Sequence, residues 1–124
     1  LSAVCRQSGC GLLLDLNNAY VNQCNLGLDL MEFIQSLPLE RVQEVHLGGY
    51  SRQGELLVDS HGSAPCAAVW DYFATFCELK PDVPCLIEWD NALPPLAELL
   101  QLQARASKIM GDSGKATRAR QSAA

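Results

Sequence analysis

The sequence predicts an α/β fold with a parallel sheet. Three short apolar runs alternate along the chain with segments in which apolar residues recur at helical spacing, and polar residues follow each run. This strand and helix order is typical of right-handed βα units, in which consecutive strands run parallel. Because the sequence contains no internal boundary or short repeat, we expect one domain over residues 1–110.

Three strands are expected in this sheet. The first begins at Gly11, and the second and third cover residues 42–47 and 85–90. Short apolar runs of this kind are typical of strands that are buried on both faces of a parallel sheet. A further apolar piece at residues 56–62 is expected to be a brief extended stretch inside a connection.

Three helices are expected between and after the strands. Residues 29–37 form the first, which Asp29 can cap at its start. Residues 65–79 form the second, where apolar side chains recur every three or four positions. The third begins at the double proline of residues 94–95. Beyond it, residues 111–124 lack apolar periodicity and are expected to form a disordered tail.

Composition excludes several classes of protein. Nine Lys and Arg against fourteen Asp and Glu give a net charge of -5, the wrong sign for a nucleic-acid-binding protein. No apolar run approaches the ~20 residues of a membrane span. The first eleven residues lack the basic and apolar regions of a secretory signal. Six cysteines without a C-x-x-C pair indicate buried thiols and a reducing, cytoplasmic compartment rather than a zinc knuckle.

Polar residues gather where the expected strands end, and parallel α/β folds place ligands at that edge. The candidate site residues are Asp15, Asn17, His46, Asp59, His61, Glu88 and Asp90. Because side chains alternate along a strand, Asp15 shares a face with Asn17, and Glu88 shares one with Asp90. Carboxylates and imidazoles together suit iron, manganese or zinc. Without a cation, such crowded carboxylates would have to share protons.

Each candidate also has a purely structural explanation. Asp15 can cap a helix, and His46 can be a hydrogen-bonded core histidine. Residues 59–61 can form an Asx-type turn that Gly62 closes. Glu88 is harder to explain in this way, because an acid at the end of a buried strand rarely lacks a partner. The residue pattern therefore predicts a metal site without naming a reaction.

Four ordered motifs resemble those of the MbnB/TglH-like family of multinuclear iron enzymes with a xylose-isomerase-like TIM barrel. They lie at residues 9–18, 44–49, 59–62 and 87–91. The resemblance implies that the chain forms the C-terminal three βα units of a (β/α)8 barrel. Its 124 residues are about half of the ~250 in a complete barrel.

The resemblance also implies a site and a chemistry. It assigns Asp15, His46 and Glu88 as iron ligands, Asp59, His61 and Asn17 to another metal position, and Asp90 to proton handling. A complete barrel would hold two or three iron ions, which would bind a substrate thiolate and activate dioxygen. The expected partners are a peptide substrate, whose cysteine is oxidised, and a separate peptide-recognition protein.

Two departures from the family pattern limit what the chain can do alone. The family's other ligands, two histidines and a bridging glutamate, lie on earlier strands that this sequence does not contain. Tyr50 stands where many members have a second histidine. Three strands of a barrel also leave two unpaired edges, so we expect a longer protein or self-association through those edges. The alternatives are a non-catalytic remnant or assembly module, and a xylose-isomerase-like metal-dependent isomerase.

Overall fold

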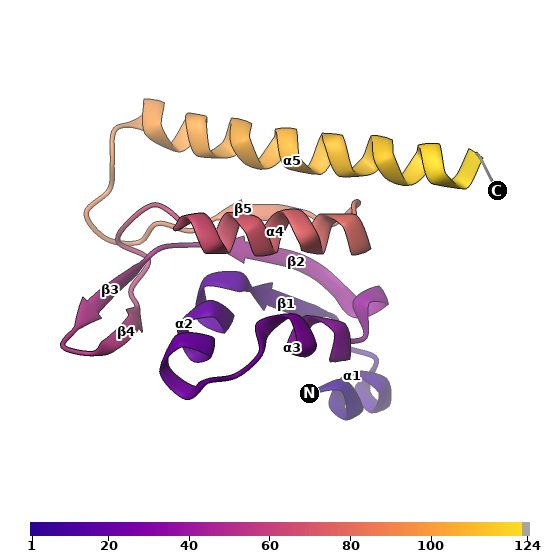
Figure 1. Ribbon diagram of the computed structural model, residues 1–124, viewed down its shortest axis with the longest axis horizontal. Helices are drawn as coiled ribbons and strands as arrows, with labels where there is room; N and C mark the ends of the chain where they lie inside the picture. The colour runs from indigo at the N-terminus through magenta and orange to yellow at the C-terminus, as the bar shows by residue number, and fades with distance from the viewer. Residues whose placement is uncertain (123–124) are drawn as a thin grey trace.

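The computed structural model describes the backbone of residues 1–122 and the side chains of residues 1–115 (Figure 1). A three-stranded parallel sheet has the order β1-β2-β5, and an antiparallel hairpin is formed by β3 and β4. The strands are β1 (Leu12–Asp15), β2 (Val42–Leu47), β3 (Tyr50–Gln53), β4 (Leu56–Asp59) and β5 (Cys85–Ile87). The helices are α1 (Ser2–Ser8), α2 (Leu16–Leu26), α3 (Leu30–Ser36), the 3-10 turn η1 (Leu39–Arg41), α4 (Ala67–Leu79) and α5 (Leu96–Ser122). The predicted α/β fold with a parallel sheet is confirmed.

Aspartate side chains start two of the helices. The carboxylate of Asp15 accepts a hydrogen bond from the Asn18 N–H at 2.9 Å, and Asp29 accepts one from the Glu32 N–H at 2.9 Å. Both caps have extended backbone, as an N-cap requires. The cap at Asp29 confirms the predicted start of α3. Asp15 is both the last residue of β1 and the N-cap of α2, so the chain passes from strand to helix at this residue.

The two faces of the parallel sheet differ. On one face Leu14, Val45 and Leu47 are buried beneath helices. On the other face Leu13 is 53% exposed and Leu86 is 46% exposed. Asp15 and His46 share this second face, because Asp15 lies two residues after Leu13 on β1, and His46 is paired with Asp15 and with Leu86 in the sheet. The candidate ligands therefore start from the uncovered side of the sheet.

The core lies between the covered face of the sheet and α4. Trp70, Phe73 and Phe76 of α4 are fully buried in one cluster with the strand residues. Each such side chain stabilises the fold by about 1.5–3 kcal/mol relative to exposure. Helix α5 lies alongside α4 (Figure 1), and its Arg105 guanidinium carbon is 4.4 Å from the centre of the Trp70 ring. Because α5 also contacts β5 and buries Ala106 in the same cluster, α4 and α5 cover the same face of the sheet.

Several predicted elements differ from the structure. The third strand, predicted over residues 85–90, ends at Ile87, because the Asp90 N–H donates to the His61 carbonyl at 2.7 Å instead of to a strand. The stretch at 56–62 contains β4, which pairs with β3. Helices α1 and α2 were not predicted, and α2 has only a weak apolar pattern.

The predicted disordered tail also differs. Helix α5 continues through residues 111–122, where the sequence predicts no secondary structure. The segment contains Ala, Lys, Arg and Gln, which favour helix, and contains no proline. An exposed helix needs no apolar stripe, so missing apolar periodicity does not by itself predict disorder. Residues 123–124 lie outside the described part of the chain.

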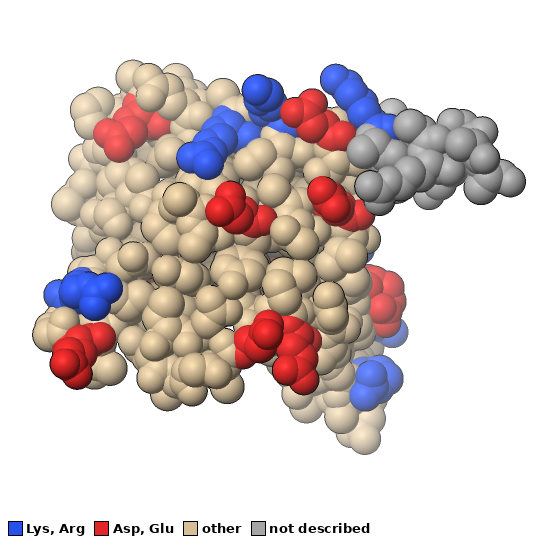
Figure 2. Space-filling view, in the orientation of Figure 1, with Lys and Arg blue, Asp and Glu red and all other residues tan. Residues whose placement is uncertain are grey.

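The surface carries mixed charge. On the face shown in Figure 2, Lys and Arg side chains are spread over several regions and lie near Asp or Glu. Within the described part of the chain, no helix has the length and apolar character needed to cross a bilayer.

Candidate metal centre

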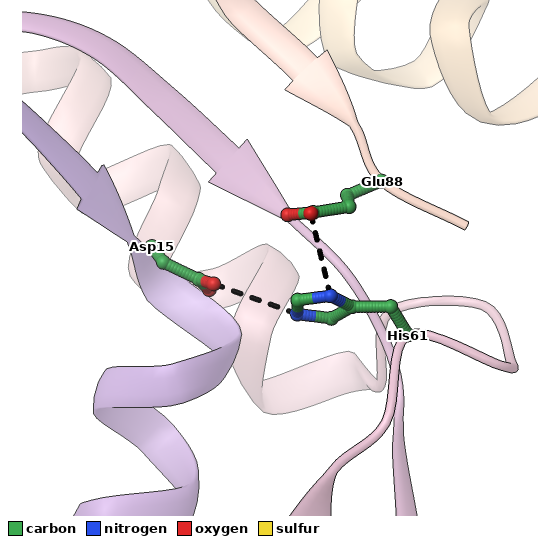
Figure 3. Close-up of side chains that lie close together, drawn as sticks. All are labelled: Asp15, His61 and Glu88. Carbon is green, nitrogen blue, oxygen red and sulfur yellow. Dashed lines mark ion pairs between the residues drawn. The ribbon is translucent and has the colours of Figure 1, made fainter. Parts of the chain in front are cut away.

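Three side chains from separate segments converge beside the sheet (Figure 3). Asp15 is the last residue of β1, His61 lies in the connection after β4, and Glu88 directly follows β5. One ligand atom from each of these residues lies within 4.8 Å of the other two. All three side chains are partly buried. Two carboxylates and one imidazole at this separation form a group that could hold a divalent cation.

The backbone holds His61 in an unusual conformation. Its φ is 47°, in the left-handed region that non-glycine residues seldom adopt. Three hydrogen bonds fix it there: its N–H donates to the Gly49 carbonyl at 2.9 Å, and its carbonyl accepts from the N–H groups of Asp90 at 2.7 Å and Asn91 at 3.4 Å. Backbone strain of this kind is often found at functional sites. The strain here aims the imidazole at Asp15 and Glu88 (Figure 3).

Four carboxylates surround the His61 ring. Nε2 lies 2.9 Å from Asp59 Oδ1 and 3.5 Å from Asp15 Oδ2. Nδ1 lies 3.4 Å from Glu88 Oε1 and 3.5 Å from Asp90 Oδ2. Burial lowers the pKa of His61, but attraction to the carboxylates of Asp59, Glu88 and Asp15 outweighs it, so the pKa is raised above its ordinary value. The centre therefore attracts positive charge.

The ionised form of the Asp15 carboxyl group is destabilised at this centre. Burial raises the pKa of its carboxyl group, and repulsion from Asp59 and Glu88 adds to the increase. The hydrogen bond from the Asn18 N–H and the attraction of His61 oppose this increase without cancelling it. Like charges that are forced together in this way either bind a proton or bind a cation.

Asn17 and Asp59 form the second part of the site. Asn17 is completely buried, and its Nδ2 donates to Asp59 Oδ1 and, at 3.1 Å, to the Gly49 carbonyl. Asn18 Nδ2 donates to the other Asp59 oxygen at 3.0 Å. Within the described part of the chain, Asn17 Oδ1 and His61 Nε2 are buried without a hydrogen-bond partner of acceptable geometry. Both atoms can donate a lone pair to a metal ion.

His46 touches the site through Glu88. Its Nδ1 lies 2.9 Å from Glu88 Oε2, and its Nε2 lies 3.5 Å from Glu44 Oε1. Its backbone is paired with that of Asp15 across β1 and β2. His46 therefore adjoins the three-residue group, although it is outside the set whose ligand atoms all lie within 4.8 Å.

All seven residues singled out from the sequence lie in one contact network, but the reason given for Asn17 was wrong. Asn17 belongs to the first turn of α2 and not to a strand, so strand alternation does not bring it to Asp15. Asn18 and Glu44, which also contact this network, were not among the predicted site residues. Each had a signal in the sequence: Asn18 follows Asn17, and Glu44 lies two positions before His46 on the same strand.

Comparison with known proteins identifies the family to which the chain is related. The family model described as RiPP precursor modification enzyme MbnB/TglH/ChrH matches residues 1–111. A UPF0276 protein of Anaeromyxobacter sp. is 40% identical over 109 residues, which are 88% of this chain and 38% of the relative. A UPF0276 protein of Chromobacterium violaceum is 42% identical over 111 residues, 90% of this chain and 40% of the relative. A third, from Rhizorhabdus wittichii, is 44% identical over 101 residues, 81% of this chain and 36% of the relative.

The chain thus spans about two fifths of the length of these curated relatives. The matched region includes every residue of the candidate centre. The family match covers most of the chain, and these three relatives are 40–44% identical to it over the aligned residues. The chain belongs to the MbnB/TglH/ChrH family of RiPP precursor modification enzymes.

Proposed function

We propose that this chain contributes metal ligands to an iron-dependent oxidase or oxygenase that modifies cysteine residues of ribosomally made peptides. The observation that carries the proposal is the approach of Asp15, His61 and Glu88 to within 4.8 Å. Membership of a family of RiPP precursor modification enzymes supports a peptide as the substrate class.

The donor set fits iron. Imidazole and carboxylate ligands with remaining open positions are typical of non-haem iron centres in oxygenases. Asn17 Oδ1, which is buried without a hydrogen-bond partner, supports a bound ion. Each buried polar atom without a partner costs about 1–3 kcal/mol, and coordination would remove that cost. An ion would also neutralise the repulsion that raises the pKa of Asp15.

We assign Asp15, His61 and Glu88 to one ion, with His46 as a further iron ligand. The 2.9 Å between His46 Nδ1 and Glu88 Oε2 supports this assignment. Two ligands at right angles, each bonded at about 2.1 Å, lie about 3 Å apart. We assign Asp59 and Asn17 to an adjacent metal position, which His61 Nε2 also faces at 2.9 Å from Asp59.

Asp90 is proposed to hold and move protons beside the ion. Its Oδ2 lies 3.5 Å from His61 Nδ1, and its side chain is 62% exposed. A carboxylate in this position can exchange protons with solvent and with groups at the centre. Bound iron would supply Lewis acidity toward the substrate thiolate and the means to activate dioxygen.

Activity is proposed for a longer protein. The chain spans about two fifths of its relatives, and the remaining ligands are expected on earlier strands. We propose that residues 1–110 form the last three βα units of a TIM barrel in a cytoplasmic enzyme with two or three irons. The uncovered sheet face supports this assignment, because in a barrel it would be the interior. The isolated chain is expected to be inactive.

Metal titration tests the proposal on the chain itself. The purified chain, titrated with ferrous iron under anaerobic conditions, should bind iron, and Glu88→Ala or His61→Ala should bind at least tenfold more weakly. Glu55→Gln is the matched control, since Glu55 is an exposed acid in the β3–β4 turn. Equal binding by all four proteins, or none by the unaltered chain, would contradict the assignment.

The reaction is tested in a longer protein that includes the missing strands. Coexpression with a cysteine-containing precursor peptide should change the mass of the peptide at cysteine. His61→Ala should abolish that change. Retained iron without any peptide modification would favour the assembly-module alternative, and a redox-silent metal would favour the isomerase.

A further inference from the structure

Two cysteines lie side by side at the other end of β1 from the candidate metal centre. The Sγ atoms of Cys5 and Cys10 are 3.9 Å apart. Cys5 belongs to α1, and Cys10 lies two residues before β1 begins. A disulfide requires sulfur atoms about 2 Å apart, so the two free thiols must move closer together before they can bond. Cys10 lies before the start of β1 and Asp15 at its end, so the two cysteines are separate from the metal ligands.

The end of α1 explains this approach. Gly9 has a φ of 73°, and its N–H donates to the Cys5 carbonyl at 3.0 Å. This is the left-handed ending of a helix, in which the next residue folds back over the last full turn. That contact is usually apolar, but here both positions are cysteine. The local backbone alone thus brings the two thiols together.

The two thiols have different surroundings. Cys5 is buried with 1% of its surface exposed, whereas Cys10 is exposed. Arg41 donates from Nη1 to the Gly9 carbonyl at 3.1 Å, which holds a positive charge beside the pair. An exposed thiol next to a cation favours the thiolate, which is the attacking species in disulfide exchange.

We propose that Cys5 and Cys10 form a thiol–disulfide exchange site that reduces small-molecule disulfides such as oxidised glutathione. The Cys10 thiolate attacks one glutathione sulfur, the glutathione S–S bond breaks, and one glutathione leaves as a thiolate. The Cys5 thiol then loses its proton to solvent and attacks the Cys10 sulfur, which releases the second glutathione. The protein loses two electrons and the glutathione disulfide gains them.

The pKa directions agree with this order of attack. Hydrogen bonding with Ser8 and then with Cys5 lowers the pKa of the Cys10 thiol, and the charge of Arg41 also lowers it. Burial raises the pKa of the Cys5 thiol, and the hydrogen bond to Cys10 adds to the increase. Cys10 is therefore the attacking thiol and Cys5 the resolving one.

Peptide mapping tests the proposal without any substitution. The reduced chain is incubated with oxidised glutathione, alkylated and digested with proteases that cut after Arg6 and before Asp15. Cys5, Cys10 and Cys24 then fall into three different peptides. We expect a disulfide-linked pair that contains Cys5 and Cys10, with Cys24, Cys66, Cys77 and Cys85 alkylated or singly glutathionylated. Linkage through Cys24, or stable glutathione on Cys10 without linkage, would overturn the proposal.

Substitutions separate the two roles. Cys5→Ala should leave glutathione attached to Cys10, because the resolving thiol is missing. Cys10→Ser should prevent linkage, and this exposed position tolerates the change. Cys24→Ser is the matched control, since Cys24 is also an exposed thiol, and it should form the linkage at the unaltered rate. If Cys10→Ser and Cys24→Ser form an intrachain disulfide equally fast, the proposed site is wrong.

Discussion

The imidazole of His61 packs against Gly48, at a distance that leaves no room for a side chain on residue 48. A Cβ at this position would lie 2.6 Å from His61 Cδ2 and 3.4 Å from the Glu88 carbonyl oxygen. Gly48 directly follows β2, next to the ends of β1 and β5. The approach of His61 to Glu88 thus depends on a residue that carries no ligand atom.

Replacement of Gly48 by Ala should weaken metal binding without removing a ligand. The new methyl group would push the His61 ring away from Asp15 and Glu88, so we expect at least a severalfold loss of iron affinity. Overpacking should also cost about 1–3 kcal/mol of the free energy of unfolding. Iron titration and urea unfolding measure the two effects.

Gly111→Ala is the control for that substitution. Nothing lies within 4 Å of a Cβ at Gly111, which sits inside α5, so Ala should leave iron binding unchanged. It should stabilise the helix by roughly 0.5–1 kcal/mol. An iron affinity for Gly48→Ala equal to that of Gly111→Ala would show that the position of His61 does not control binding.

The sequence could predict the strand-end residues because their pattern is local. Apolar runs identify buried strands, and parallel strands bring their carboxyl ends together, so Asp15, His46 and Glu88 could be grouped. The hairpin was not predictable in the same way. Tyr50–Gln53 is polar and mostly exposed, so it has no alternating apolar pattern.

The precise ligand geometry was beyond sequence patterns for a different reason. His61 reaches the centre through a left-handed backbone, a hydrogen bond to Gly49 and the missing side chain of Gly48. These are tertiary relationships between residues on different segments. Asn17 illustrates the same limit, because its contact with Asp59 depends on the tight change from β1 to α2 at Asp15.

Metal affinity should fall as the pH is lowered through the pKa of His61. Only the neutral imidazole can bind a metal ion, so protons compete with the metal. Since the carboxylates raise this pKa above its ordinary value despite burial, competition should begin at a higher pH than for a free histidine. Titration with a chromophoric competing chelator at several pH values measures the effect. His61→Ala should show a weaker pH dependence as well as a lower affinity, and parallel curves would contradict this role.

The stability of the metal-free chain should respond to pH in the opposite direction. A pKa that is raised in the folded state means that protonated His61 stabilises folding. This contribution is complete below the unfolded pKa of 6.5 and is lost as the pH rises through the higher folded value. In urea unfolding at acidic pH, the chelator-treated chain should therefore have a larger free energy of unfolding than the His61→Gln variant. The difference should shrink as the pH rises. A difference that grows with pH would reverse the assigned sign.

Alkaline pH should destabilise the chain through two thiols near the core. Burial raises the pKa of Cys77 and of Cys85 from 9.0 to about 12. Their neutral forms thus contribute stability that is complete below pH 9 and is lost as the pH rises toward 12. Cys77→Ala should reduce this alkaline loss, which urea unfolding measures, and should leave iron binding unchanged. An unaltered alkaline loss in this variant would contradict the assignment to Cys77.

The uncovered face of the sheet provides a test of the proposed barrel. Leu13 is 53% exposed in this chain, so Leu13→Ala should change its free energy of unfolding by less than about 1 kcal/mol. In a longer protein that supplies the preceding strands, the same side chain would enter the barrel interior, and the substitution should cost about 2–5 kcal/mol. Phe73→Ala is the reference, because Phe73 is fully buried here and should cost about 3–5 kcal/mol in either protein. An equal, small cost of Leu13→Ala in both proteins would mean that upstream strands do not cover this face, and the metal centre beside it would then stay open to solvent.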